Sequence, residues 1–165
     1  MKPYLNKIIL VTILAFLCLQ KNYSQCNIKI NNRSDGTTVR YLNPELVGIG
    51  TNCQLGLSIQ TNGIDYFLTT TVRYFSPYKK IIGSLKIQLS NNNSLDIPLY
   101  TSELATIKNE DVALSIFTLS EADVINMKKA NIKTIIFKED DDNNQIIIVD
   151  RNYDVLKRHI KCLQQ

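Results

Sequence analysis

The 165-residue sequence lacks the short motifs that support most known enzyme chemistry. It has no glycine-rich phosphate loop, no Gly-x-Ser-x-Gly elbow and no His-Glu-x-x-His segment, which excludes the chemistries that those motifs carry. Carboxylates do not recur at a spacing typical of an acid–base pair. These absences favour a structural or binding protein over an enzyme, and we expect no cofactor.

Histidine and cysteine are also scarce, with one histidine and four cysteines in the chain. No Cys-x-x-Cys or histidine-rich spacing indicates a metal site. His159 and Cys162 stand three residues apart, and an imidazole close to a thiol can take its proton, so a hydrolase or thiol enzyme is the catalytic alternative. However, neighbouring turns of one helix seldom direct both groups into one cleft. A surface or half-buried histidine is therefore expected.

The N-terminal segment has the layout of a secretory signal peptide. Lys2 and Lys7 precede an apolar run over residues 8–19, and a polar stretch follows. The run is shorter than the roughly twenty residues that span a bilayer. We therefore expect residues 1–25 to be cleaved and residues 26–165 to form a single β-rich domain without a transmembrane segment.

The end of this leader indicates where the protein goes. The Ser24-Gln25 ending, in a chain rich in Ile, Asn and Lys, resembles leaders of exported proteins from AT-rich Gram-negative bacteria. The expected location is therefore periplasmic or extracellular. Cys26 directly after the leader makes lipoprotein anchoring an alternative, although Tyr23 and Gln25 replace the residues that a lipobox requires.

Removal of the leader changes the charge of the chain. Three lysines leave with it, so the formal net charge falls from +4 to +1. Nucleic-acid binding depends on clustered contacts between basic side chains and phosphates. A near-neutral mature chain therefore gives no case for a nucleic-acid partner.

A long β-hairpin over residues 53–75 is the clearest structural signal. Apolar and polar residues alternate in its first arm, the period of a strand with one buried face. Asn62-Gly63 suits the positive φ angles of a two-residue type I′ turn. The second arm is rich in β-branched and aromatic residues. Its predicted inward face comprises Ile64, Tyr66, Leu68, Thr70, Val72 and Tyr74.

Turn residues divide the remainder of the chain into further strands. Residues 81–89 and 95–99 are predicted to extend the hairpin into a four-strand meander. Pro98 cannot donate a ladder hydrogen bond, which indicates an edge or a bulge. The stretches 46–52 and 101–111 are predicted to be connections. Other predicted strands cover residues 26–30, 37–42, 112–119, 132–138 and 145–150.

Two helices complete the predicted fold. Ser120 and Asp123 can form a capping box before the first helix. Asn152 is expected to cap the second, whose apolar stripe includes Leu156 and Ile160. The predicted fold class is α+β, antiparallel and β-rich, a meander or sandwich of about seven strands with one inserted helix and one C-terminal helix.

Aromatic and basic residues meet near the turn that follows the hairpin. Tyr74, Tyr78, Lys79 and Lys80 are the predicted ligand-binding residues, because aromatic rings interleaved with cations can stack on sugars or bases. The alternative is that such rings form cross-strand pairs that hold the hairpin together.

An acidic turn precedes the last predicted strand. Asp140, Asp142 and Asn144 alternate as in a calcium loop. Gln145 replaces the required glycine and Arg151 replaces the bidentate glutamate, which excludes an EF-hand. We predict no metal site, with a loose cation site at the three alternating residues as the lesser candidate and a solvated hairpin turn as the alternative.

Three cysteines remain once the leader is removed, enough for one disulfide and one thiol in an oxidising compartment. Cys53 begins the inward face of the hairpin, so a buried thiol is expected there. Cys26 and Cys162 lie near the mature termini, which are often close in a folded domain. We favour this pairing over the two alternatives that include Cys53.

These features predict an exported, non-catalytic structural or binding protein of the bacterial envelope whose partner is an envelope protein or a glycan. Two alternatives stay open. One is a small envelope hydrolase or thiol enzyme using His159 and Cys162. The other is a secreted inhibitor or partner subunit that binds through an exposed strand edge such as residues 95–100.

Overall fold

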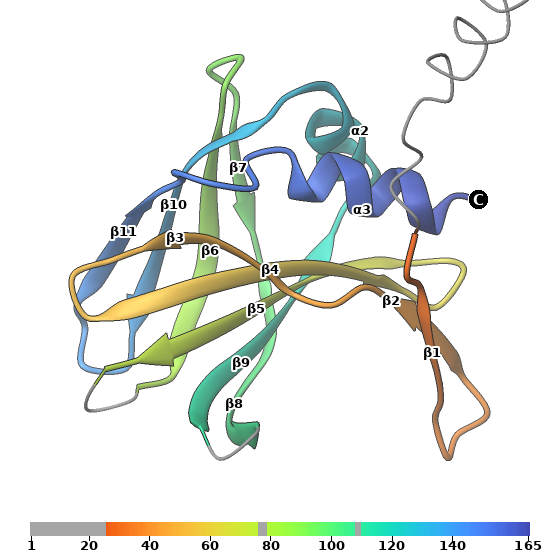
Figure 1. The fold of residues 1–165 in the computed structure, drawn as a ribbon, viewed down its shortest axis with the longest axis horizontal. Coiled ribbons are helices and arrows are strands. Elements are labelled where there is room, and N and C mark those ends of the chain that lie inside the picture. The colour runs from red at the N-terminus through yellow and green to blue at the C-terminus, as the bar shows by residue number, and fades with distance from the viewer. Residues whose placement is uncertain (1–25, 76–78, 108–109) are drawn as a thin grey trace, which may run out of the picture.

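The computed structural model describes residues 26–75, 79–107 and 110–165, in which eleven strands and two helices form (Figure 1). The strands build two antiparallel sheets, and one helix lies mid-chain and the other at the C-terminus. The predicted α+β class is confirmed. The strands outnumber the seven expected in part because two stretches predicted to be connections are strands, β3 (Glu45–Ile49) and β8 (Leu99–Ile107).

The larger sheet has seven strands. In spatial order they are β1 (Lys29–Asn32), β2 (Thr38–Tyr41), β4 (Cys53–Thr61), β5 (Tyr66–Tyr74), β9 (Glu110–Leu119) and β8 (Leu99–Ile107), with β3 (Glu45–Ile49) as a second neighbour of β4. Strands β2 and β3 share one edge of β4: β2 pairs near Thr61, and β3 pairs between Gln54 and Leu57. A gap in the ladder therefore falls at Ile59.

Strands β4 and β5 form the predicted hairpin, paired in register from Cys53↔Tyr74 to Thr61↔Tyr66. Four inward residues of β4 are fully buried: Cys53, Leu55, Leu57 and Ile59. The inward face of β5 is confirmed from Leu68 to Tyr74. Alternation therefore identified the faces correctly on both arms, because one side of each strand faces the core shared by the two sheets.

The turn of this hairpin differs from the prediction. It is a four-residue loop, Asn62 to Asp65, and Ile64 is exposed in it rather than inward. Gly63 has the expected positive φ of 94°, but Asn62 does not share it. Instead, the Asn62 side-chain oxygen accepts hydrogen bonds from the backbone N–H groups of Ile64 (2.9 Å) and Asp65 (2.7 Å). This Asx-type turn replaces the predicted type I′ turn.

Replacing Gly63 by valine is expected to lower the free energy of unfolding by about 1 kcal/mol or more, because a β-branched residue is strained at positive φ. No neighbouring atom lies within 4 Å of a Cβ built there, so strain rather than a clash is tested. Chemical denaturation measures the loss, with Ile64→Val in the same turn as the control. An unchanged midpoint for Gly63→Val would count against the positive φ.

The smaller sheet has four strands and corrects the predicted meander. In spatial order they are β11 (Asn144–Ile148), β10 (Ile132–Glu139), β6 (Ile81–Leu89) and β7 (Ser94–Ile97). Strand β5 pairs with β9 rather than with β6, so the two predicted hairpins lie in different sheets. Turn residues show where a chain reverses, whereas the choice of neighbouring strand depends on contacts that are distant in sequence.

Pro98 marks the point where the chain passes from one sheet to the other. Strand β7 ends before it at the edge of the four-stranded sheet, and β8 begins after it at the edge of the seven-stranded sheet. The register of β8 shifts between Leu99 and Thr101. The predicted edge position is confirmed, as expected for a residue that cannot donate to a ladder, but the single strand predicted over residues 95–99 is divided at Pro98 between the two sheets.

Two predicted connections are strands. Strand β8 has mostly exposed side chains at a sheet edge, so its sequence shows no buried face. Strand β3 contains Gly48, which suggested a loop. Its lack of a side chain serves packing instead, because a Cβ there would lie 2.7 Å from the carbonyl oxygen of Ile148 in β11.

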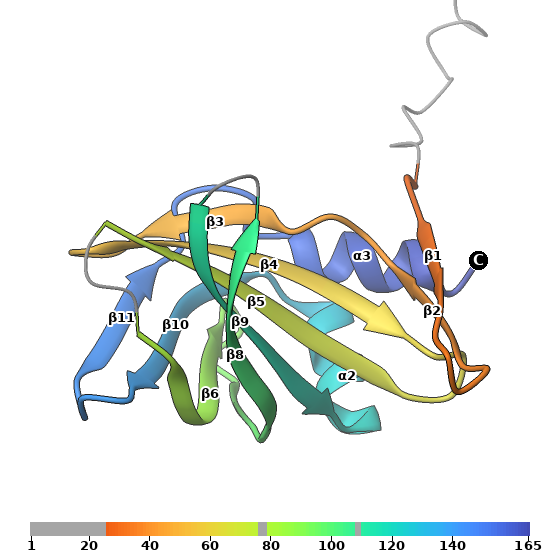
Figure 2. The same cartoon turned by 90° about the horizontal axis from the view of Figure 1, so that it is seen from below.

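Helix α2 (Glu121–Lys129) follows β9, and helix α3 (Val155–Leu163) follows β11. The capping box is confirmed: the Asp123 N–H donates to Ser120 Oγ (3.2 Å), and the Ser120 N–H donates to Asp123 Oδ2 (2.9 Å). Asn152 does not cap α3, because the helix starts after Asp154. The side-chain amide of Asn152 instead donates to the carbonyl oxygen of Leu46 (2.8 Å). Helix α3 packs against β4 and α2 (Figure 2).

Candidate functional site

The four predicted ligand residues do not gather at a surface site. Tyr74 is 8% exposed and belongs to the core. Lys79 forms ion pairs with Glu139 and Asp141, and Lys80 is exposed. Tyr78 lies outside the described residues. The described part of this site is therefore a partly buried contact between the chain after β5 and the β10–β11 turn.

Glu139 is the centre of that contact and is fully buried. Its Oε2 accepts from Lys79 Nζ (3.3 Å) and from the Gln145 side-chain amide (3.1 Å). Burial, and then the charge of Glu139, raise the pKa of the Tyr74 phenol and raise the pKa of the Cys53 thiol to about 11. Both groups are thus held neutral and protonated, which makes them poor nucleophiles.

The acidic turn joins β10 to β11 as a hairpin. Asp142 has a positive φ of 68° and pairs with Lys138 (2.7 Å), and the Asp140 N–H donates to the carbonyl oxygen of Lys80 (3.0 Å). Lysines thus neutralise the carboxylates of Asp141 and Asp142. Within residues 26–75, 79–107 and 110–165, no three His, Cys, Asp or Glu side chains are placed to hold a metal ion. The structure gives the loose cation site no support.

The disulfide joins Cys26 to Cys162, with 5.5 Å between their Cα atoms, and Cys53 is a buried free thiol. The favoured pairing is confirmed. The bridge ties the chain before β1 to the last turn of α3, and both lie at the same end of the molecule (Figure 1). It also uses the Cys26 sulfur, which in a lipoprotein would carry a diacylglyceryl thioether instead. The structure therefore gives the lipoprotein alternative no support.

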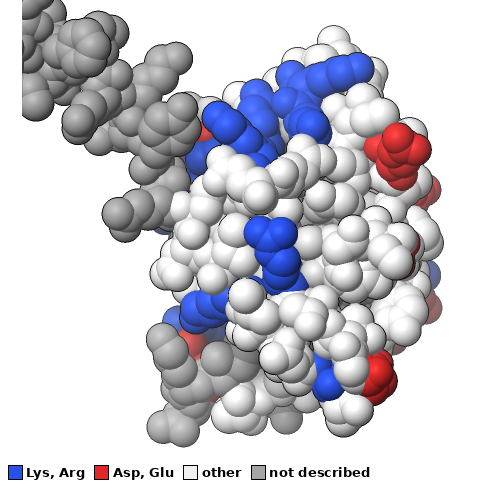
Figure 3. Space-filling view, turned by 90° about the vertical axis from the view of Figure 1, so that its right-hand side faces the viewer, with Lys and Arg blue, Asp and Glu red and all other residues white. Residues whose placement is uncertain are grey.

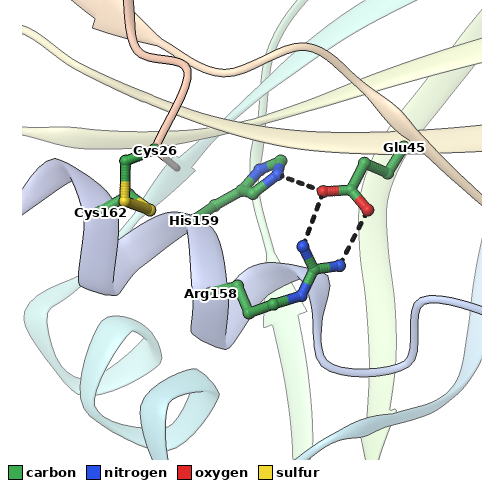
Figure 4. The surroundings of a disulfide bond; sticks show 5 residues. All are labelled: Cys26, Glu45, Arg158, His159 and Cys162. Carbon is green, nitrogen blue, oxygen red and sulfur yellow. Dashed lines mark hydrogen bonds and ion pairs between the residues drawn. A yellow bond between two sulfur atoms is a disulfide. The ribbon is translucent and has the colours of Figure 1, made fainter. Parts of the chain in front are cut away.

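A second cluster surrounds His159 on the same helix (Figure 4). His159 Nε2 lies 3.0 Å from Glu45 Oε1. Arg158 donates two hydrogen bonds to the same carboxylate, from Nη1 to Oε1 (3.0 Å) and from Nη2 to Oε2 (2.8 Å). Its Nε donates to Asp154 (3.1 Å). Glu45 is thus held by two neighbouring side chains of α3. Such bidentate pairs are the stronger class of charged hydrogen bonds.

The other ring nitrogen of His159 completes the β-ladder. His159 Nδ1 accepts the backbone N–H of Ile59 (3.3 Å), which falls in the gap between β2 and β3. A buried N–H without a partner costs about 1 to 3 kcal/mol, so the imidazole serves as a substitute strand neighbour. Because Nδ1 accepts, the proton of the neutral ring must sit on Nε2, which donates to Glu45.

His159 is therefore a buried structural residue, 2% exposed, and the expected surface or half-buried histidine is wrong. Burial lowers the pKa of His159, although the carboxylate of Glu45 acts to raise it. The paired guanidinium of Arg158 lowers the pKa of Glu45. Cys162 points to Cys26, away from His159, and its sulfur is in the bridge (Figure 4). The arrangement gives no support to a thiol nucleophile activated by this histidine.

A cleft on the outer face of the larger sheet is the best candidate for a binding site. It encloses about 190 Å³ between the β1–β2 hairpin, the β4–β5 turn and the start of β8. Phe67 and Tyr100 form its aromatic wall, with ring centroids 6.1 Å apart at an angle of 57°. Its lining residues are Arg33, Thr37, Val39, Gln60, Asn62, Phe67, Tyr100 and Ile116.

Local turns position the polar residues of this cleft. Arg33 sits at the tip of the β1–β2 hairpin, where its N–H donates to the carbonyl oxygen of Thr37 (2.9 Å). The Thr37 N–H in turn donates to the Asp35 side chain (2.8 Å), whose pKa this bond lowers. Within the described residues, the side chains of Arg33 and Gln60 have no hydrogen-bond partner, so their donors are available to a ligand.

A wider depression of about 360 Å³ lies on the same outer face. It is lined from the opposite ends of β4, β5 and β9, including Gln54, Thr71 and Val112. Arg73 at its rim pairs with Glu110 (2.9 Å), unlike Arg33 in the cleft. The outer face of the seven-stranded sheet therefore offers two hollows, of which the cleft holds the unpaired cation.

Sequence reasoning missed the residues that matter most in both clusters. Glu45 lay just before a predicted loop and carried no signal. Tyr100 entered only as the end of the candidate binding edge over residues 95–100, not as part of an aromatic site. Alternation did place Phe67 opposite the core face. The cleft itself could not be predicted from local sequence patterns, because residues from five different strands line it.

Comparison with family models, with curated proteins and with solved structures gave no match. Neither helix in the described ranges is long and apolar enough to cross a membrane.

Proposed function

We propose that the chain is an exported, non-catalytic binding module of the bacterial envelope that recognises its ligand in the outer-face cleft. The observation that carries the proposal is the joint presence of an exposed aromatic wall and unpaired polar donors in that cleft. Pockets of this kind orient a ligand with a few polar groups on an otherwise apolar lining. The disulfide is compatible with the oxidising compartment that export implies.

Export is tested by the mass of the protein recovered from the cell. The recovered chain is expected to begin near Gln25 or Cys26, as the N-terminal pattern of charge and hydropathy predicts. Intact-mass measurement of envelope and cytoplasmic fractions reads this directly. Full-length chain confined to the cytoplasm would contradict export.

Binding is tested with the oxidised protein and a panel of peptides, neutral oligosaccharides and acidic oligosaccharides. A ligand in the cleft is expected to shift the backbone amide signals of Gln60, Phe67 and Tyr100 in NMR spectra. The variant Tyr100→Ala should reduce that response, whereas Tyr153→Ala, an exposed tyrosine before α3, should not. A panel in which no probe moves these signals would contradict the proposed binding surface.

The exposed strand edge supports a second candidate, a partner subunit or inhibitor. Strand β8 forms one edge of the seven-stranded sheet, and β7 forms an edge of the other sheet, so residues 95–100 border both. Edges of this kind can accept a strand from a partner. Binding at this edge can be distinguished from binding in the cleft by hydrogen exchange. A partner strand would protect the outer backbone amides of β8, whereas a ligand in the cleft would not pair with them.

A further inference from the structure

We infer that the cleft recognises a saccharide unit that carries a carboxylate, such as a hexuronic acid within a glycan. The inference rests on the proposed binding function and names the ligand class for the same cleft. It follows from the size of the cleft, the type of its walls and the balance of charge around it.

The size of the cleft favours one ring of a ligand at a time. Its 190 Å³ is below the roughly 300 to 1,000 Å³ typical of pockets for drug-sized molecules. A peptide bound in extended form needs a long groove or a strand edge. The cleft instead ends at the β1–β2 hairpin on one side and at Tyr100 on the other.

The walls match the two chemical faces of a sugar. Tyr100 is 70% exposed and packs against Phe67 in a tilted arrangement, so much of its side chain is open to a ligand. Aromatic faces are electron-rich and attract the weakly positive C–H groups of a sugar ring. The Gln60 amide and the Arg33 guanidinium provide donors for the hydroxyl and acid groups at the edge of that ring.

Charge decides between a neutral and an acidic saccharide. No aspartate or glutamate is among the residues that line the cleft. Within the described residues Arg33 forms no ion pair, although its charge helps to lower the pKa of nearby Asp35. Asp35, on the same hairpin, instead bonds to the backbone of Thr37. On the end of the molecule seen in Figure 3, Lys and Arg side chains gather mainly at the top of the view, on the side of the helices, and are scattered elsewhere. Guanidinium groups bind carboxylates in a bidentate manner, which favours the acid.

The experiment compares a galacturonic acid trimer with the matching neutral galactose trimer, each titrated into the oxidised protein and followed by NMR. The acid trimer is expected to bind more tightly. Arg33→Gln should weaken the acid trimer about tenfold and the neutral trimer less than about twofold, because it removes the charged contact alone. Tyr100→Ala should weaken both about tenfold or more through loss of stacking.

Matched controls keep the result specific to the cleft. Arg151→Gln and Tyr153→Ala change the same residue types at exposed positions outside the cleft lining and should leave both affinities unchanged. Melting curves establish that each variant is folded. If Tyr100→Ala fails to fold, Tyr100→Leu keeps an apolar side chain there and still removes the aromatic face.

The outcomes separate this inference from the proposed function. Equal affinity for the two trimers, or equal weakening of both by Arg33→Gln, would overturn the carboxylate assignment. A peptide that shifts the cleft signals when neither trimer does would overturn the saccharide class and leave the binding module standing. No response of the cleft to any probe would overturn both.

Discussion

Replacing Cys26 and Cys162 together by serine is expected to lower the free energy of unfolding by about 2 to 4 kcal/mol. The bridge spans 136 residues, and loop-entropy models assign about 5 kcal/mol to such a closure. Native bridges often deliver less, because the reduced chain retains structure in its unfolded state. Urea denaturation of the oxidised, reduced and doubly substituted proteins measures the loss.

Cys53→Ala provides the control for this experiment. The variant keeps the bridge, so it should remain sensitive to reductant, whereas the double serine variant should not respond to reductant at all. Identical denaturation midpoints with and without the bridge would contradict the prediction. Peptide mapping of unreduced protein should also show Cys26 joined to Cys162 and Cys53 protected from alkylation until the protein is denatured.

On reduction of the bridge, loss of structure should begin in the β1–β2 hairpin. Strand β1 is exposed along its length, and β2 pairs with β4 only through Arg40 and Tyr41. The bridge is therefore a main tether of this hairpin, and its amides should lose hydrogen-exchange protection first on reduction. Because Arg33 and Thr37 line the cleft from this hairpin, reduction should also weaken ligand binding.

Replacing His159 by alanine is expected to lower the free energy of unfolding by about 3 kcal/mol or more. The change leaves a cavity beneath α3, removes the acceptor of the Ile59 N–H and takes one donor from Glu45. Thermal or urea denaturation at neutral pH measures it. A loss below about 1 kcal/mol would mean that water or another group satisfies Ile59.

The same residue should make stability depend on pH. Because the folded pKa of His159 is lowered, the unfolded state binds more protons below the unfolded value of about 6.5. The contribution of His159 to the free energy of unfolding is thus complete above about pH 6.5. It declines as pH falls below that value, by at most about 1.4 kcal/mol per pH unit. The pKa of Glu45 is also lowered in the folded protein. Glu45 therefore stabilises the fold at pH values above its unfolded pKa, and this stabilisation is lost as the pH falls through its folded pKa.

His159→Gln isolates this dependence, because glutamine offers an acceptor and a donor but does not titrate. His159 is the single histidine of the chain, so the variant should be nearly flat between pH 7 and pH 5 where the parent protein loses stability. Equal pH profiles for the two proteins would show that other groups cause the loss. The imidazole NMR signals of the parent should report the lowered pKa directly.

Local sequence patterns determined the inward faces of the hairpin arms, the capping box of α2 and the edge at Pro98. They also identified Cys53 as a buried thiol and favoured the bridge between the termini. Each of these depends on neighbours a few residues apart, on the period of a strand or on the general closeness of chain ends. No knowledge of the sheet order was needed.

The tertiary structure alone decided which strands pair, and with them the two clusters. His159 is buried because β2 and β3 leave the Ile59 N–H without a backbone acceptor, and the helix supplies one from 100 residues away. The aromatic cleft exists because β5, β9 and β8 lie side by side, which brings Phe67 next to Tyr100. Contacts between residues so distant in sequence leave no local period, so only the folded chain reveals them.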